Sequence, residues 1–398
     1  MIERALIVSS LLLVFVIPWE NAVILDGLGT ISRLIGLLVA GFWIASVMVT
    51  GRFRKLQPFH WLVLTFVIWN VVSILWSIDN TLSMERARTY VQLAILVLIL
   101  WDVCRTPAIL AAALQAYVWG AYVAVVSLLY QYFLLGGAAY QSRLTAAGFN
   151  TNDLALILAL GIPVAWHLTL HRDVPRARWV RWFDYGYIPI ALMSILLTAS
   201  RGALLAALPG FMYIFLSLNH LKLHHRLTLL GGAIGSLYLL LPFVPQTAFQ
   251  RLGNTGQVVS QGDLNGRLGI WLEGLRLFAE HPMIGVGTGA FRTANTVADK
   301  VAHNFALTLA VELGLIGLTL FLIILVAAAL GALRQPRWRA LFWLSVLMIW
   351  FLGASTHNWE YRKQTWLFLD LIAISTALYG RRRKDSPIPH EPVRWQPA

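Results

Sequence analysis

Apolar residues form long runs along most of the chain, and polar residues gather in the stretches between the runs. A helix that crosses a bilayer needs roughly 20 predominantly apolar residues, and most of the runs approach or exceed that length. The twelve apolar segments that can be drawn are 4–20, 29–50, 60–78, 88–103, 108–135, 151–170, 184–200, 202–219, 227–244, 303–333, 340–355 and 364–380. The pattern therefore predicts an all-α polytopic membrane protein with about twelve transmembrane helices.

The composition excludes an ordinary soluble enzyme. Hydrophobic residues make up 58% of the chain, charged residues only 12%, and the mean hydropathy is +0.69. Soluble domains contain about 25% charged residues. The single cysteine cannot form an internal disulfide, and no small-residue cleavage pattern follows the first segment, so we expect that segment to remain as a span.

The net charge of +13 could point to nucleic acid, but its distribution along the chain indicates a membrane partner instead. Most of the 31 Lys and Arg residues fall in alternate links, as expected for links that stay in the cytoplasm beside anionic lipid. We therefore predict cytoplasmic termini and no nucleic-acid partner. The predicted organisation is helices 1–9 in 1–244, a long periplasmic loop in 245–302, helices 10–12 in 303–380, and a cytoplasmic tail in 381–398.

The long outer link is the first candidate for a functional segment, because structureless loops of this length are uncommon. Residues 266–281 have the spacing of an amphipathic helix, whose apolar face would be Leu268, Trp271, Leu272, Leu275 and Phe278. Arg267 would lie in its first turn, where the helix dipole disfavours a cation unless an anion such as phosphate binds there. The Gly285-x-Gly287-x-Gly289 sequence that follows predicts a flexible turn, and it precedes no Rossmann unit.

The segment from His303 to Gly317 opens the tenth predicted helix. At about 100° per residue, His303, Ala310, Gly314 and Gly317 would share one face, and Glu312 would lie on the other. Small residues at this spacing predict a closely approaching neighbouring helix. His303 would then sit at the mouth of this face.

The candidate site residues are the cations and polar groups expected beside the outer ends of the helices. Each has a simpler alternative: Arg201 as a snorkelling residue, Arg267 paired with Asp263, Arg276 paired with Glu273 and Glu280, or His303 as an interfacial histidine. Recurrence of cations without matching acids favours anion binding. The candidates are His303, Arg201 and Arg267 as catalytic residues, and Arg143, Asn152, Asn304, Arg276, Arg292 and His357 as substrate-binding residues.

No set of metal ligands stands out, so we expect neither a metal nor a cofactor. A reaction that expels a diphosphate without Mg²⁺ must stabilise the leaving charge with protein cations. Arginine can do so, and a histidine near neutral pH can accept a proton from an attacking hydroxyl.

Four motifs together resemble those of the O-antigen ligase and O-antigen polymerase superfamily. They are His303-Asn304 followed by Gly314 and Gly317; Thr198-x-Ser200-Arg201-Gly202; Arg143 with Gly148-Phe149-Asn150 and Asn152; and Gly285-x-Gly287 before Phe291. Thr151 stands where many members have proline. The resemblance covers about residues 143–320, with the motifs in the family's order.

The resemblance implies a C-type glycosyltransferase-like fold in the bacterial inner membrane, with a periplasmic active site. The donor would be a glycan on undecaprenyl diphosphate. Arg201 and Arg267 would bind the diphosphate, and His303 would be either the general base or a further diphosphate contact.

Three family reactions share these motifs. A ligase transfers O-antigen to lipid A–core, a polymerase extends the lipid-linked glycan, and O-linked oligosaccharyltransferases, which modify proteins, usually have a large soluble C-terminal region. The compact chain favours an inverting, metal-independent O-antigen ligase of lipopolysaccharide biosynthesis, with polymerase as the alternative. A flippase for lipid-linked sugars is a second alternative, and it would predict charged residues and broken helices near the bilayer midplane.

Overall fold

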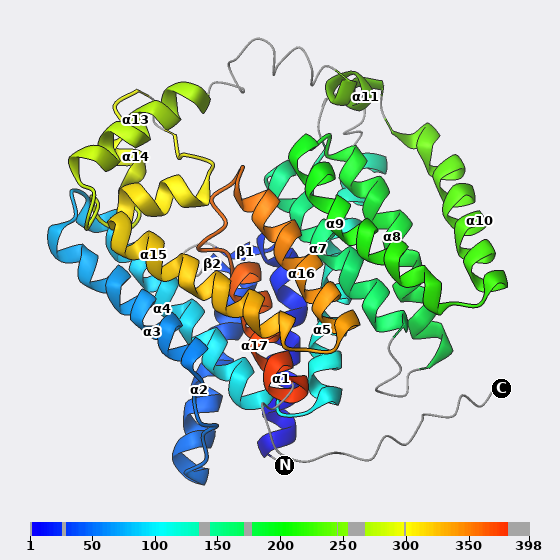
Figure 1. Cartoon of the computed structure of the whole chain (residues 1–398), viewed down its shortest axis with the longest axis horizontal. Coiled ribbons are helices and arrows are strands. Elements are labelled where there is room, and N and C mark those ends of the chain that lie inside the picture. Colours follow the sequence, from blue (N-terminus) through cyan, green and yellow to red (C-terminus); the bar gives the residue numbers. More distant parts are fainter. Residues whose placement is uncertain are drawn as a thin grey trace.

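The computed structural model of the chain describes residues 2–25, 29–134, 144–170, 177–244, 246–253, 267–297 and 300–380. Within these ranges, every predicted apolar segment corresponds to a long helix (Figure 1). These helices are α1 (Ile2–Val16), α2 (Ile31–Thr50), α3 (Pro58–Val72), α4 (Asn80–Val103), α5 (Pro107–Phe133), α7 (Thr151–Leu170), α8 (Arg178–Leu197), α9 (Arg201–Ser217), α10 (Leu223–Leu240), α15 (Phe305–Leu333), α16 (Arg337–Ala354) and α17 (Lys363–Tyr379).

The remaining elements are short. They are the helices α11 (Gln246–Gly253), α13 (Arg267–Glu280) and α14 (Phe291–Ala294), the 3-10 turns η1 (Ile17–Ala22), η2 (Ser73–Trp76), η3 (Leu218–His220) and η4 (Leu241–Phe243), and the strands β1 (Ile24–Leu25) and β2 (Gly29–Thr30). The two strands pair antiparallel, with Ile24 opposite Thr30.

Eight of the described helices have the length and composition to cross a membrane. Three of these spans differ from the bounds of a single helix: Ile2–Ala22 runs through η1, Pro58–Trp76 runs through η2, and Arg226–Phe243 runs from within α10 through η4. The other five are α2, α5, α7, α15 and α16 over their own bounds. The prediction of an all-α polytopic membrane protein is confirmed. The count of twelve spans and the C-type fold remain predictions.

The helix starts follow ordinary capping chemistry. The side chains of Asp79, Thr106 and Asn304 accept hydrogen bonds from backbone N–H groups in the first turns of α4, α5 and α15, at 3.0, 3.3 and 3.0 Å. Proline stands at the first position of α3 and α5, where its missing N–H costs no helical bond.

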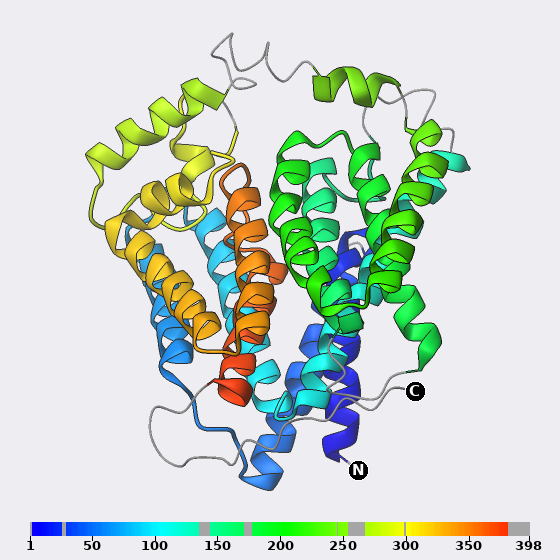
Figure 2. The same ribbon diagram turned by 45° about the vertical axis from the view of Figure 1, so that its right-hand side comes forward.

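The core centres on α7, of which nearly every residue is buried. It packs against α5, α8, α9 and α16, while α3 packs against α15 and α1 against α5. The N-terminus lies at one end of the assembly, and α11 and α13 lie at the opposite end (Figure 2). The candidate site residues described below belong to the α13 end.

Helix α15 is interrupted, and this corrects the prediction that Gly314 allows the approach of a neighbouring helix. Gly314 has φ 67° and ψ −169°, which breaks the helix. A Cβ at this position would lie 2.2 Å from the carbonyl oxygen of Met283, so loop backbone occupies the space beside it. His303 also lies outside the helix, which begins at Phe305.

The Gly285–Gly289 turn is held tightly, whereas the sequence predicted a flexible turn. The amides of Val286 and Gly287 donate to the carbonyl oxygens of Val311 and Glu312, both at 2.9 Å. The Thr288 hydroxyl donates to Asn70 Oδ1 at 2.8 Å, and its amide donates to Ser73 Oγ at 3.1 Å. The turn is therefore anchored both to the interrupted helix and to the end of α3.

Candidate active site

The centre of the candidate site is the junction between the loop before α15 and the link between α16 and α17. His303 has φ 50°, a left-handed conformation that is uncommon for residues other than glycine. Its backbone N–H donates to Asn358 Oδ1 at 2.8 Å, and the Asn358 amide donates to the Thr308 hydroxyl. The next residue, Asn304, caps α15 and donates to the Ser355 carbonyl at 3.2 Å. Both sides of the junction are thus held together beside the imidazole.

His357 lies next to His303 in this junction. The two ring centroids are 6.4 Å apart, in an edge-to-face arrangement. The Nδ1 atom of His357 is 3.0 Å from the Gly353 carbonyl and 2.9 Å from the Thr356 hydroxyl. The link thus places a second imidazole beside the predicted catalytic one.

Helix α13 brings Arg267 to the same place. The predicted amphipathic helix is confirmed, and Arg267 is its first residue. One turn further along, the Trp271 indole donates to the Ala302 carbonyl at 2.8 Å, immediately before His303. Gly274 lies against Leu307 of α15, where a Cβ would be 3.0 Å from the Leu307 side chain. These contacts dock the start of α13 over the start of α15 (Figure 1).

The face by which α13 docks differs from the predicted apolar face. Ile270, Gly274 and Leu277 are buried, whereas Leu268, Leu272 and Leu275 are about half exposed. The hydrophobic pattern located the helix correctly. It did not indicate that an outward apolar strip would remain.

The imidazole of His303 is neutral over the physiological range. Burial lowers its pKa to about 4, and the positive charges of Arg267 and His357 act in the same direction, while Asp153 opposes them. Burial likewise lowers the pKa of the Arg267 guanidinium. A neutral imidazole beside a cation can accept a proton while the cation holds an anion.

Asn152 and Arg201 approach the junction from α7 and α9. Ser200, the N-cap of α9, donates its hydroxyl hydrogen to Asn152 Oδ1 at 2.8 Å, which joins two of the four motifs. Arg201 is the first residue of α9, and a Cβ on the next residue, Gly202, would lie 3.2 Å from the Thr356 hydroxyl. The start of α9 therefore packs against the link that holds His303.

Asp153 was not among the predicted site residues, although it ties the α16–α17 link to α7. Its carboxylate accepts hydrogen bonds from the Trp359 indole at 2.8 Å and from Arg362 at 2.7 Å. The partners are more than 200 residues apart. The sequence analysis did not single out Asp153, because its partners are distant along the chain.

Glu360 is a second residue that the sequence analysis missed. It is 1% exposed, and its carboxylate makes no hydrogen bond of ordinary geometry within the described residues. Burial raises the pKa of Glu360 to about 8, with Arg86 acting in the opposite direction. The Arg86 guanidinium lies 3.5 Å from the centre of the neighbouring Tyr361 ring. No local sequence signal distinguishes this acid from an exposed one.

The other predicted substrate-binding residues have different surroundings. Arg276 pairs with Glu273 at 2.8 Å and with Glu280, so the surface-pairing alternative is the one that the structure shows. Arg292 is exposed on α14. Arg143 and the possible partner of Arg267, Asp263, lie outside the described residues. Among the residues that are described, no three His, Cys, Asp or Glu side chains form a group that could hold a metal ion.

A comparison with models of protein families tests the resemblance that the four motifs indicate. Residues 187–322 match the family model described as O-antigen ligase. This segment of the chain is similar to the O-antigen ligase family, which supports the resemblance seen in the motifs. The matched segment contains three of the four motifs, while the motif from Arg143 to Asn152 precedes it. No curated protein matches the chain.

The match supports the predicted class at a coarse level. The family that residues 187–322 match is a glycosyltransferase-like family of the O-antigen ligase and polymerase type. Substrates of this family are, in general, a lipid-linked glycan and lipid A–core. The specific reaction and the roles of individual residues belong to the proposal below.

Proposed function

We propose that this protein transfers a glycan from undecaprenyl diphosphate to a sugar hydroxyl of lipid A–core, at the periplasmic face of the inner membrane. The proposal is carried by the geometry of the junction: a hydrogen bond to Asn358 fixes His303, and the Trp271 contact with Ala302 holds the start of α13, which begins with Arg267, beside it. A base and an anion-binding cation side by side fit a reaction that removes a proton and releases a diphosphate.

The proposed step is a single inverting displacement. The acceptor oxygen forms a bond to the anomeric carbon as the bond from that carbon to the diphosphate oxygen breaks. A ring nitrogen of His303 takes the hydroxyl proton, and the electron pair of the broken bond leaves with the diphosphate. Arg201 and Arg267 hold that diphosphate, because a guanidinium binds phosphate oxygens in a bidentate manner.

The lowered pKa supports the base role of His303 over a role as a charged diphosphate contact. With its pKa lowered to about 4, the imidazole is uncharged at neutral pH, and the ring nitrogen that carries no hydrogen can accept the proton of the hydroxyl. The incoming diphosphate adds negative charge beside the ring and raises its proton affinity at the moment it is needed.

The test is incubation of the purified protein with a lipid-linked glycan and either lipid A–core or a glycan acceptor. Arg201→Ala and His303→Ala should each lower turnover by about 10² to 10⁴-fold, the usual range for loss of acid–base or oxyanion stabilisation. Arg52→Ala, which removes an exposed cation at the opposite end of the molecule, is the matched control. Normal turnover in both site variants would refute the proposal. Extension of the lipid-linked glycan without transfer to lipid A–core would identify a polymerase.

The broken helix α15 favours a second candidate function, transport of the lipid-linked sugar. A transporter is expected to contain an interrupted helix near buried charge, and Gly314 interrupts α15 two residues after buried Glu312. However, protein groups close this break: the amide of Leu315 donates to Pro282, and the Trp69 indole donates to the Leu313 carbonyl at 3.1 Å. Transfer of lipid-linked glycan across vesicle membranes, without consumption of the donor, would establish transport instead.

A further inference from the structure

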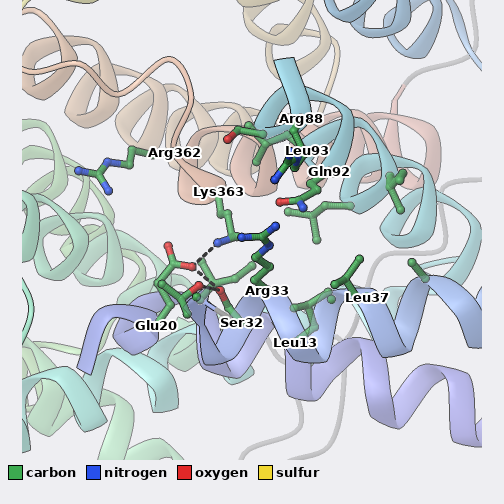
Figure 3. A pocket seen from close by; sticks show the side chains of 18 of the residues that line it. Leu13, Glu20, Ser32, Arg33, Leu37, Arg88, Gln92, Leu93, Arg362 and Lys363 are labelled. Atoms are coloured by element: carbon green, nitrogen blue, oxygen red, sulfur yellow. Dashed lines mark hydrogen bonds and ion pairs between the residues drawn. The ribbon is translucent and has the colours of Figure 1, made fainter. Parts of the chain in front are cut away.

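A cavity of about 500 Å³, whose lining does not include His303, lies between α1, α2, α4 and the start of α17 (Figure 3). Sites for small molecules usually enclose about 300 to 1,000 Å³. One part of its wall is apolar, and the other end carries charged side chains. The apolar residues are Leu13, Ile17, Gly36, Leu37, Ala40, Leu93, Ile95, Leu96 and Ile99, and the charged ones are Glu20, Arg33, Glu85, Arg88, Arg362 and Lys363.

Two of the four cations that line this cavity are already paired. The Lys363 ammonium forms an ion pair with Glu20, which also accepts a hydrogen bond from the Ser32 hydroxyl. Arg362 forms its ion pair with Asp153 at 2.7 Å. These pairs satisfy the acids Glu20 and Asp153 and fix one side of the charged end.

The other two cations, Arg33 and Arg88, have no such partner. Neither forms a hydrogen bond or an ion pair with a described residue, and the Nε atom of Arg33 is buried without an acceptor. Glu85 also lines the cavity but is not bonded to either guanidinium. Figure 3 shows Arg33 extending toward Lys363 and Gln92, with Arg88 nearby. A buried N–H without an acceptor beside several like charges is unfavourable, so the arrangement favours a bound anion.

The apolar wall indicates that this anion is attached to a hydrocarbon chain. Leu13 of α1 lies beside Gly36 of α2: a Cβ on Gly36 would be 3.7 Å from Leu13 Cδ1. Leu37 is 54% exposed and its neighbour Leu38 74% exposed, as expected for a side of α2 that faces the hydrocarbon of a bilayer. A chain can therefore lie along the wall while its head group stays at the charged end.

We propose that the cavity binds an anionic phospholipid of the surrounding bilayer, with its phosphate on Arg33 and Arg88 and an acyl chain against Leu13, Leu37 and Leu96. Guanidinium groups bind phosphate oxygens strongly, and an aliphatic chain is held by burial of its apolar surface. None of His303, Arg201 and Arg267 lines the cavity, although Arg362 of the α16–α17 link does.

The proposal is tested by native mass spectrometry of the full chain in detergent, titrated with phosphatidylglycerol. The double variant Arg33→Gln, Arg88→Gln should bind this lipid at least about tenfold more weakly than the unmodified chain, because both charge-assisted contacts are lost. The control, Arg52→Gln with Arg178→Gln, removes the same charge from exposed positions outside the cavity and should bind normally.

A second variant tests the apolar wall without changing charge. Gly36→Leu places its side chain in the space that the acyl chain would occupy, and it should also weaken phosphatidylglycerol binding while the thermal melting temperature in detergent is retained. Equal binding by the double variant, or equal binding of neutral diacylglycerol by the unmodified chain, would overturn the proposal. Competition by inorganic phosphate alone would exclude a lipid-specific site, and tighter binding of undecaprenyl phosphate would assign the cavity to the donor lipid instead.

Discussion

His303 has a backbone conformation that costs about 1–3 kcal/mol for a residue with a Cβ, and the surrounding contacts maintain it. Its φ of 50° turns the chain sharply before α15, and the hydrogen bond from its N–H to Asn358 Oδ1 holds that turn. Because Asn304 also binds Ser355, two successive residues are fixed to the same link. The proposed role of the imidazole depends on this arrangement.

Replacement of Asn358 by alanine should disturb the position of His303 without removing any proposed catalytic group. The variant leaves the His303 N–H without its acceptor and Thr308 without its donor. We expect a fall in kcat of about tenfold or more with little change in KM, since misplacement of a base affects the reaction step more than binding. Asn358→Asp, which keeps the acceptor oxygen, should recover part of the activity. Equal kcat in Asn358→Ala and the unmodified protein would contradict this role.

The pKa of His303 predicts the acidic side of the pH profile. The free imidazole is lost as a base only when pH falls through its pKa of about 4, so kcat/KM should stay high well below pH 6.5. Burial is the main cause, and the charge of Arg267 is the next. Arg267→Gln removes that charge, which raises the pKa of His303 and should move the acidic limb to higher pH.

The measurement is the pH at which kcat/KM falls to half its maximum on the acidic side. Each variant's profile is scaled to its own maximum. Arg276→Gln is the control, because this arginine lies on the same helix but is not among the main charges that shift the pKa of His303. An acidic limb near pH 6.5 in the unmodified protein, or no movement in Arg267→Gln, would show that His303 is not the titrating base.

Single residues were predictable from sequence only as candidates. The motif positions Arg201, Arg267 and His303 were identified because cations and a histidine recur beside the ends of apolar segments. Asp153 and Asn358 were not, since their partners are distant in the sequence and their bonds depend on tertiary packing. The pairing of Arg276 with Glu273 and Glu280 follows from helical spacing, and it was already among the alternatives.

The interruption of α15 is the main feature at the scale of secondary-structure elements. The break frees backbone groups, and these pair with the preceding loop: Val286 and Gly287 donate to α15, while Leu315 and Ile316 donate to Pro282 and Met283. Unpaired backbone groups are costly within a bilayer, so irregular backbone persists there only where protein satisfies it. The loop and the helix therefore depend on each other.

A side chain at Gly314 should separate the loop from the helix. In Gly314→Ala the Cβ would lie 2.2 Å from the Met283 oxygen, at a φ of 67° that alanine disfavours. We expect a loss of more than about 1–3 kcal/mol from backbone strain alone, seen as a lower melting temperature in detergent and as reduced activity.

The matched control for this substitution is Gly232→Ala in α10. No atom lies within 4 Å of a Cβ at Gly232, and alanine favours a helix over glycine by roughly 0.5–1 kcal/mol. This control should retain or slightly raise the melting temperature. An equally stable Gly314→Ala protein would show that the loop tolerates displacement.

The apolar pattern predicted the helices well but could not reveal how one of them is broken. A glycine within a long apolar run is also expected at helix contacts, and only the facing loop backbone decides between the two. The same holds for α13: amphipathic spacing predicts a helix and its apolar face, but it does not identify the element against which that helix packs. Its buried side is formed by Ile270, Gly274 and Leu277, where Gly274 allows the close approach of α15.

At the scale of the whole molecule, the basic links that predict the cytoplasmic side and the candidate active site lie at opposite ends. The basic links that predict the cytoplasmic side include residues 51–60 and 104–107, whereas His303, Arg267 and the start of α9 belong to the other end. The order of the apolar segments and the net charge of each link between them could be predicted from the sequence, because both are local properties. The packing of α7 at the centre was not, since its hydrophobic pattern resembles that of the lipid-facing segments.

Cysteine labelling tests this orientation directly. The only native cysteine, Cys104, is buried, and Cys104→Ser gives an unlabelled background. In that background, Val297→Cys reports on the loop before α15, where Val297 is 60% exposed, and Arg52→Cys reports on the exposed link after α2. A maleimide that cannot cross the membrane should label position 297 in intact spheroplasts and position 52 only after lysis, because basic links are retained in the cytoplasm. Labelling of position 52 before lysis, with position 297 protected, would place His303 in the cytoplasm, where a periplasmic glycan transfer could not use it.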